Sequence, residues 1–241
     1  MKLLLLSNSK VEGQAYLEYA IPHLGAFFAG RVQRAAFIPY ANAAGDYLGF
    51  ESRAAPAFAA AGVELRSVTR DADPVAAVRD AQAVVVGGGS TWKLLRDVRR
   101  LGLLDAIASR VRAGAPYAGW SAGANLACPT IMTTNDMPIV YPPTFDALGL
   151  VPFQINPHYL HGNPPGFKGE TREERITEFG TLNPDTWVAG LREGTGFVVD
   201  DGTLRLIGPH ECRVFRHGLD PREVAPTEDF AFLLDSAPPR P

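Results

Sequence analysis

Residues 119–123 read Gly-Trp-Ser-Ala-Gly and fit the pattern G-x-S-x-G. They follow a short apolar run that predicts a buried strand, and helix-compatible residues come after them. This is the context of a nucleophile elbow, a sharp strand-to-helix turn that exposes a serine hydroxyl. The pattern predicts Ser121 as a nucleophile and the backbone N–H of Ala122 as a donor to a developing oxyanion. The alternative is that the small residues only form a tight turn.

The chain before this turn alternates between apolar runs and stretches with helical spacing. Strand-like stretches lie at residues 2–6, 32–38, 63–68 and 83–86, and those at 2–6 and 83–86 are compact apolar runs. Continuous rather than alternating apolar strands, each followed by a helix, predict a buried parallel sheet. We therefore expect an α/β fold, with a mostly parallel sheet that carries helices on both faces.

The C-terminal part of the chain has short strand-like runs that follow one another without intervening helices. These runs lie at residues 188–191, 196–199, 204–207 and 213–215, with a turn at residues 200–202. They predict a C-terminal β meander that closes the sheet. Without a linker or a repeat, residues 1–241 are expected to form a single domain, with a disordered tail from about residue 235.

A second glycine-rich turn follows the apolar run at residues 83–86. It reads Gly-Gly-Gly-Ser-Thr at residues 87–91 and matches neither a P-loop nor a dinucleotide fingerprint. Glycines at a strand end let backbone N–H groups approach a ligand. We interpret Gly88 as the second oxyanion donor, and the alternative is a flexible turn. Turns at neighbouring strand ends would face one crevice, where open α/β sheets place their sites.

A nucleophilic serine needs a base and a group that orients the base. His158 follows the strand-like residues 153–156 and is the best-placed histidine, whereas His161 lies further along the loop. Three acids are candidates for the orienting group: Asp136 in a loop, and Glu193 and Asp200, each after a strand-like run. Periodicity and spacing leave the choice among them open.

A charged segment, residues 169–175, opens a predicted helix with a capping box of Thr171 and Glu174. Arg172 and Arg175 are three residues apart and share one face of that helix. One reading is a solvated helix surface. The functional reading is that one guanidinium binds a substrate carboxylate through its planar fork.

Composition limits the classes of function. Hydrophobic residues make up 46% and charged residues 20%, which is globular rather than disordered. A net charge of −3 gives no basic excess for binding nucleic acid. Two cysteines, Cys128 and Cys212, exclude a disulfide framework and a cysteine-rich zinc site. With only four leucines near the N-terminus and no membrane-length apolar window, we expect a soluble cytoplasmic protein without a membrane segment.

Several blocks, taken in order, resemble the peptidase E family of serine peptidases, the α-aspartyl dipeptidases. The matching blocks run nearly from end to end and lie at residues 4–9, 37–39, 86–89, 119–131, 133–140, 154–158, 168–173 and 193–194. The resemblance implies a fold similar to class I glutamine amidotransferase domains, which is flavodoxin-like. It also implies a triad of Ser121, His158 and Glu193, and no metal or cofactor.

The family resemblance also implies a substrate: a dipeptide, or some tripeptides, with N-terminal aspartate and a free amine. Arg172 is then the candidate partner of the aspartate side chain. Asp136 and Ser90 are further candidates for substrate binding. Ser90 stands where the family often has asparagine, and Tyr141 stands where it often has an acid. Both differences could tune rate or specificity.

Two other functions stay open at this point. One is a hydrolase of β-aspartyl-arginine similar to cyanophycinase, and the other is a ligand-binding member of the fold without catalysis. We expect the peptide substrate to be the partner of a monomer or homodimer. Residues 159–169, rich in proline and glycine, are a candidate lid.

Overall fold

The computed structural model describes residues 1–163, 165–166 and 168–239. Its main sheet consists, from edge to edge, of β3 (Glu64–Ser67), β2 (Arg34–Ile38), β4 (Val84–Val86), β5 (Tyr117–Trp120), β1 (Lys2–Leu6), β8 (Gly196–Asp200) and β9 (Thr203–Ile207). The strands from β3 to β1 are parallel, and β8 and β9 join them as an antiparallel hairpin. The predicted mostly parallel α/β sheet is confirmed.

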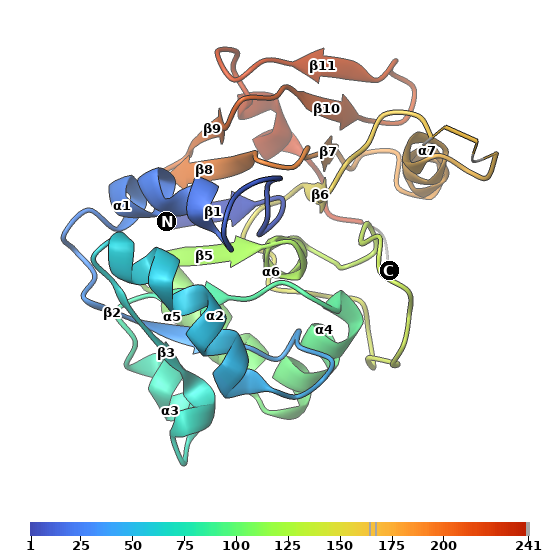
Figure 1. The fold of residues 1–241 in the computed structure, drawn as a ribbon. Helices are drawn as coiled ribbons and strands as arrows, with labels where there is room; N and C mark the ends of the chain where they lie inside the picture. The colour runs from blue at the N-terminus through green and yellow to red at the C-terminus, as the bar shows by residue number, and fades with distance from the viewer. Residues whose placement is uncertain (164, 167, 240–241) are drawn as a thin grey trace.

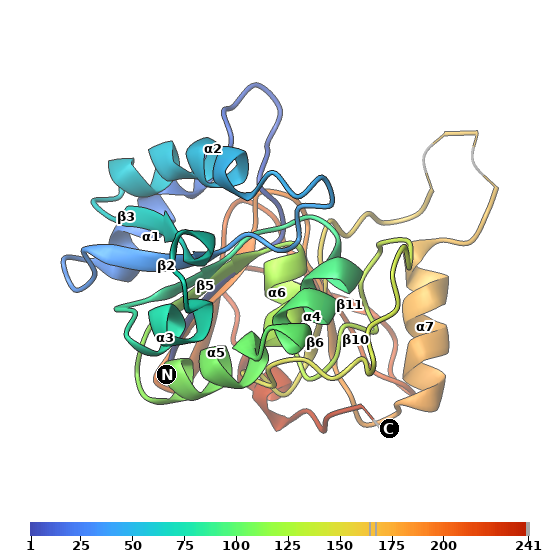
Figure 2. The same cartoon turned by 90° about the horizontal axis from the view of Figure 1, so that it is seen from below.

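Helices cover both faces of this sheet (Figures 1 and 2). One face packs on α1 (Ile21–Phe28) and α2 (Tyr47–Ala60). The other packs on α3 (Pro74–Arg79), α4 (Thr91–Arg100), α5 (Leu103–Arg112) and α6 (Ala122–Ala127). Single-turn 3-10 helices lie at Glu18–Ala20, Val68–Arg70 and Ala231–Asp235. None of the helices in the described ranges is both long and apolar enough to cross a membrane.

The C-terminal strands are divided between two sheets. A second sheet has the order β11 (Arg222–Val224), β10 (Cys212–Phe215), β7 (Val188–Gly190) and β6 (Gln154–Asn156). The expected meander therefore splits: the β8–β9 hairpin extends the main sheet, while β10 pairs back with β7. The apolar pattern marks the strands but carries no information on their partners, because both sheets bury the same kinds of side chain.

Helix α7 (Arg172–Leu182) lies beside the second sheet, at the outer edge of the molecule (Figure 1). The predicted capping box is present: the Thr171 hydroxyl accepts the Glu174 N–H at 3.1 Å, and Glu174 accepts the Thr171 N–H at 2.6 Å. The helix continues past the buried Gly180 and ends at Leu182. Ile176 of α7 packs with apolar side chains of the second sheet.

The C-terminal segment is hydrogen-bonded to the residues around the start of β7. Ser236 accepts the Trp187 N–H at 2.9 Å, and the Ala237 N–H donates to the Asp185 carbonyl at 3.2 Å. The disorder expected from about residue 235 stays a prediction. Residues 240–241 lie outside the described residues.

Candidate active site

Ser121 occupies the turn between β5 and α6. Its backbone has φ 50° and ψ −110°, a conformation that residues other than glycine rarely adopt. The flanking glycines permit the turn. A Cβ on Gly119 would lie 2.6 Å from the Gly123 carbonyl oxygen, and a Cβ on Gly123 would overlap the Val86 carbonyl oxygen. This is the geometry of a nucleophile elbow, because a strained, tightly packed turn presents the serine at the carboxyl edge of the sheet.

His158 follows β6 and reaches the serine from the second sheet. Its Nε2 lies 3.0 Å from the Ser121 Oγ. Its backbone is left-handed, with φ 54°, and its N–H donates to the Ser7 hydroxyl at 2.8 Å. Ser7 is fully buried and donates in turn to the Leu191 carbonyl at 2.8 Å. The imidazole is therefore held from its backbone by a residue at the end of β1.

Of the three acids that spacing left open, Glu193 is the one that contacts the histidine. Its Oε1 lies 2.7 Å from the His158 Nδ1. Asp136 instead accepts the N–H of Thr91, at the start of α4, at 2.6 Å. Asp200 pairs with Lys2 at the opposite edge of the sheet, at 3.1 Å. The structure thus brings Ser121, His158 and Glu193 into one chain of hydrogen bonds.

Two backbone amides beside the serine are candidate oxyanion donors. Gly88 packs closely against this turn, because a Cβ on it would lie 2.8 Å from the Trp120 ring and 3.1 Å from the Ser121 Cβ. Ala122 is the first residue of α6. Neither the Gly88 nor the Ala122 N–H donates a hydrogen bond within the part of the chain described. Both amides are free to bind a negative oxygen next to Ser121.

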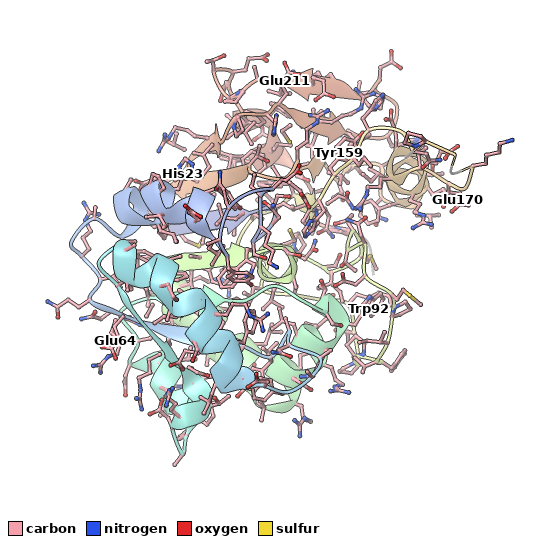
Figure 3. All side chains as sticks on the ribbon, viewed as in Figure 1. His23, Glu64, Trp92, Tyr159, Glu170 and Glu211 are labelled. Carbon is pink, nitrogen blue, oxygen red and sulfur yellow. The ribbon has the colours of Figure 1, made fainter. Side chains whose placement is uncertain are left out.

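A cavity of about 690 Å³ opens over Ser121 and His158. Ser90 and Asp136, the further candidates for substrate binding, are among the residues that line it. The Ser90 hydroxyl already accepts the Lys93 N–H of α4 at 3.3 Å, so it acts as a helix cap as well. Trp92, which lies beside the loop that carries Asp136, donates its indole N–H to the Asp136 carbonyl at 3.1 Å (Figure 3).

Comparison with known proteins supplies the family. A model of peptidase family S51 matches residues 3–207. The chain belongs to peptidase family S51. It is 49% identical over 228 residues to peptidase E of Citrobacter koseri, covering 95% of this chain and 98% of that protein. It is 49% identical over 236 residues to peptidase E of Streptomyces coelicolor, covering 98% and 96%.

Solved structures show the same fold. A putative peptidase E protein from Listeria monocytogenes has a TM-score of 0.66 at 22% identity, covering 86% of this chain and 98% of that chain. A peptidase from an acI-B1 actinobacterium has a TM-score of 0.68 at 17% identity, covering 95% and 96%. The match to family S51 and the identity to proteins named peptidase E make this chain a serine peptidase, and so a hydrolase.

Arg172 lies in an adjoining cavity of this S51 peptidase rather than over the serine. That cavity, of about 660 Å³, shares His158 with the first and is also lined by Glu193. The half-buried guanidinium donates to the Pro157 carbonyl at 3.5 Å and has no ion pair within the described residues. Burial lowers the pKa of Arg172, and the charge of Arg175 lowers it further. An unpaired, partly desolvated cation of this kind favours an incoming anion.

Behind Glu193, a network of ion pairs anchors its loop in the S51 fold. The Arg192 guanidinium donates two hydrogen bonds, of 2.6 and 2.7 Å, to the carboxylate of Glu223 on β11. Arg213 of β10 bridges Glu223 at 3.4 Å and Glu173 of α7 at 3.0 Å. The hydrogen bonds from Arg192 hold the pKa of Glu223 below its ordinary value. The acid beside the histidine is thus fixed by its neighbour in the chain.

Three residues of the site escaped sequence reasoning. Ser7, Tyr16 and Arg53 are all close to it, the last two as part of the lining of the Ser121 cavity. Ser7 follows the apolar run at residues 2–6 and belongs to the first block that resembles the family, but neither signal assigns it a role. Tyr16 and Arg53 lie in a loop and on a helix that carry no motif, so nothing in their spacing pointed to the site.

Proposed function

We propose that this S51 peptidase hydrolyses dipeptides, and some longer short peptides, that begin with aspartate, through an acyl-enzyme on Ser121. The observation that carries the proposal is the chain of hydrogen bonds from Ser121 through His158 to Glu193. The similarity to proteins named peptidase E supports it. The resemblance in sequence supplies the preference for aspartate.

Acylation begins with proton transfer from the Ser121 hydroxyl to the His158 Nε2, which are 3.0 Å apart. The Oγ attacks the carbonyl carbon of the N-terminal residue and forms a tetrahedral intermediate. The N–H groups of Gly88 and Ala122 stabilise its oxyanion. His158 then donates the proton to the leaving nitrogen, and the C-terminal residue departs with a free amine.

Deacylation repeats these roles with water. His158 takes a proton from the water that attacks the acyl-enzyme, and returns it to the Ser121 Oγ as the amino acid is released. Glu193 accepts the Nδ1–H at 2.7 Å, which fixes the tautomer and stabilises the imidazolium that forms twice in each cycle. The small peptide is the only reactant besides water that this mechanism requires.

Two charges suit the N-terminal aspartate of such a substrate. Arg172 offers an unpaired guanidinium to the side-chain carboxylate, because it lies in the cavity that adjoins His158 and Glu193. Asp136 offers negative charge in the Ser121 cavity for the free ammonium group. One of its carboxylate oxygens, Oδ2, holds the Thr91 N–H, which fixes the position of the carboxylate.

The test of the reaction is hydrolysis of Asp-Leu beside Leu-Leu, N-acetyl-Asp-Leu and β-Asp-Arg. We expect cleavage of Asp-Leu alone, lost by several orders of magnitude in Ser121→Ala and unchanged in Ser52→Ala, an exposed serine of α2. Cleavage of β-Asp-Arg instead would identify a cyanophycinase-like enzyme. No cleavage, and no labelling of Ser121 by a fluorophosphonate, would identify a binding protein.

The test of specificity is Arg172→Ala against Arg175→Ala. Both arginines lie on α7, but Arg175 is 63% exposed and pairs with Glu170 at 3.4 Å. We expect Arg172→Ala to reduce the preference for Asp-Leu over Leu-Leu at least tenfold, about 1.4 kcal/mol, because the aspartate loses a charged partner. An unchanged preference would exclude Arg172 as that partner.

A further inference from the structure

The cavity over Ser121 contains a cation to which the steps above give no role. Among the described residues that line this cavity, Arg53 is the one lysine or arginine. The carboxylates that line the same cavity are those of Asp46 and Asp136. At about 690 Å³ the cavity falls in the range of small-molecule sites, about 300–1,000 Å³, so it has room for the main chain and the C-terminal end of a dipeptide.

Arg53 projects from α2 and has no partner of its own. It forms no hydrogen bond or ion pair in the described ranges, whereas Arg66 and Arg70 nearby in the sequence pair with Asp71 and Glu51 at 2.9 Å. Burial raises the pKa of the Tyr16 phenol overall, and the positive charge of Arg53 acts on that phenol in the opposite direction. The Arg53 charge therefore reaches the wall of the cavity. A free guanidinium at the edge of a catalytic cavity is suited to bind a carboxylate.

The hydroxyl groups around Arg53 link it to the nucleophile. Tyr16 accepts the indole N–H of Trp120, the residue before Ser121, at 3.0 Å. Ser9 lines the cavity and interacts with the Tyr16 hydroxyl. Hydroxyl donors beside a guanidinium are the groups that complete a carboxylate site.

The carboxylates of the cavity lie away from this group. Asp46 caps the start of α2, where it accepts the Gly49 N–H at 2.9 Å, and Arg53 lies two helical turns further on, about 10 Å along the axis. Asp136 comes from the loop after α6 and accepts the N–H of Thr91, the first residue of α4, at 2.6 Å. Arg53 and Asp136 thus line the cavity from different elements, which separates its positive charge from this negative one.

We propose that Arg53, assisted by Ser9 and Tyr16, binds the free C-terminal carboxylate of the substrate. The inference rests on the proposed function, since it extends the same substrate across the same cavity. A dipeptide carries an ammonium and a carboxylate at its two ends, about 7 Å apart when extended. With the ammonium at Asp136 and the scissile carbonyl at Ser121, the carboxylate faces Arg53.

This site also selects for length. Each added residue moves the C-terminal carboxylate about 3.3–3.6 Å further along an extended chain, beyond the fixed guanidinium. Dipeptides are then favoured over longer peptides by charge pairing at the far end. A C-terminal amide keeps the shape of the dipeptide and removes the charge, so it isolates the contribution of Arg53.

The experiment compares Asp-Leu with Asp-Leu amide. We expect the wild type to have at least a tenfold lower KM for the acid, and Arg53→Ala to lose that difference while its KM for the amide stays within twofold. Arg53→Lys should recover part of the difference. The matched control is Arg79→Ala, an exposed helical arginine of α3 outside the cavity, which should behave as wild type.

Two results would overturn the proposal. If Arg53→Ala raised the KM for Asp-Leu and for Asp-Leu amide by the same factor, Arg53 would not contact the C-terminal carboxylate. If Arg53→Ala instead lost the preference for Asp-Leu over Asn-Leu, Arg53 would bind the side-chain carboxylate. Calorimetric binding of both peptides to Ser121→Ala, with and without Arg53→Ala, separates this proposal from the reaction. Arg53-dependent binding without turnover in the wild type would refute the proposed function alone, and no preference for the acid would refute the subsite.

Discussion

Replacing Ser7 with alanine should impair catalysis, although Ser7 is not among the residues that line the Ser121 cavity. The Ser7 hydroxyl is fully buried and makes two bonds of 2.8 Å, accepting the His158 N–H and donating to the Leu191 carbonyl. In Ser7→Ala the Leu191 carbonyl keeps the Tyr159 N–H at 2.8 Å, but the His158 N–H is left without its partner. A buried amide N–H without a hydrogen-bond partner lowers the stability of the fold by about 1–3 kcal/mol.

The same loss should displace the catalytic imidazole. His158 has φ 54°, a left-handed conformation that is about 1–2 kcal/mol unfavourable for L residues and is here held by the bond to Ser7. Released from that bond, the backbone can relax and move Nε2 away from the Ser121 Oγ. A displacement of about 1 Å at a catalytic group lowers the rate about 100-fold. We therefore expect kcat to fall by one to two orders of magnitude, with KM little changed.

Ser236→Ala provides the matched control. Ser236 is also buried, accepts the Trp187 N–H at 2.9 Å and donates to the Ala237 carbonyl at 3.3 Å, which keeps the Thr186 hydroxyl at 2.8 Å. Both variants should lose about 2 kcal/mol of stability, a Tm decrease of about 4–8 °C for a chain of this size.

Activity is measured well below both melting temperatures, as hydrolysis of Asp-Leu and as the rate at which a fluorophosphonate labels Ser121. The labelling rate reports on the serine and its base without a peptide. Full labelling activity in Ser7→Ala, at a stability equal to that of Ser236→Ala, would refute the positioning role. Equal loss of activity in both variants would refute it too, because the effect would then come from stability.

Three further predictions follow from single contacts. Gly88→Ala places a Cβ 2.8 Å from the Trp120 ring, so the loop should shift and lose its oxyanion donor, lowering kcat by about 10²–10³ with little change in KM, measured on Asp-Leu. The hydrogen bonds from Arg192 lower the pKa of Glu223 from 4.5, so the ionised carboxylate stabilises the fold above pH 4.5 and this contribution is lost as the pH falls. Glu223→Gln should therefore be less stable than the wild type at pH 7. Its free energy of unfolding should decline less between pH 5 and pH 3. Burial raises the pKa of Cys128 to about 12, so a maleimide should label it at pH 8 only after unfolding.

The main sheet could be predicted because most of its parallel strands are short, largely apolar segments that alternate with helices along the chain. The second sheet could not, since β7 and β10 are separated in the chain by a hairpin that belongs to the main sheet. Their apolar spacing identifies strands but is the same for either partner. Pairing between distant strands is set by how the two sheets pack, and a local pattern does not contain that information.

The site shows the same division between local and distant contacts. The elbow at Ser121 was predictable because its glycines, strand and helix are all neighbours in the sequence. The position of Glu193 opposite His158 was not, since 35 residues separate them and Asp136 had an equally suitable spacing. The resemblance to a family resolved that choice in favour of Glu193, and the contact at 2.7 Å agrees with it. The catalytic roles remain predictions for the experiments above.

The end of β1 explains why a site divided between two sheets holds together. Three consecutive residues each bind the backbone of one part of the site: the Leu6 carbonyl accepts the Ser121 N–H at 3.0 Å, the Ser7 hydroxyl accepts the His158 N–H at 2.8 Å, and the Asn8 side chain accepts the Gly194 N–H, next to Glu193, at 2.9 Å. Ser121 comes from the main sheet, and the other two come from loops of the second. Because all three bonds start from one short segment of one strand end, the relative positions of nucleophile, base and acid depend on the main chain at residues 6–8 more than on the packing of the two sheets. A change in how the sheets pack would therefore shift the site as a unit, whereas a change at residues 6–8 would separate its members.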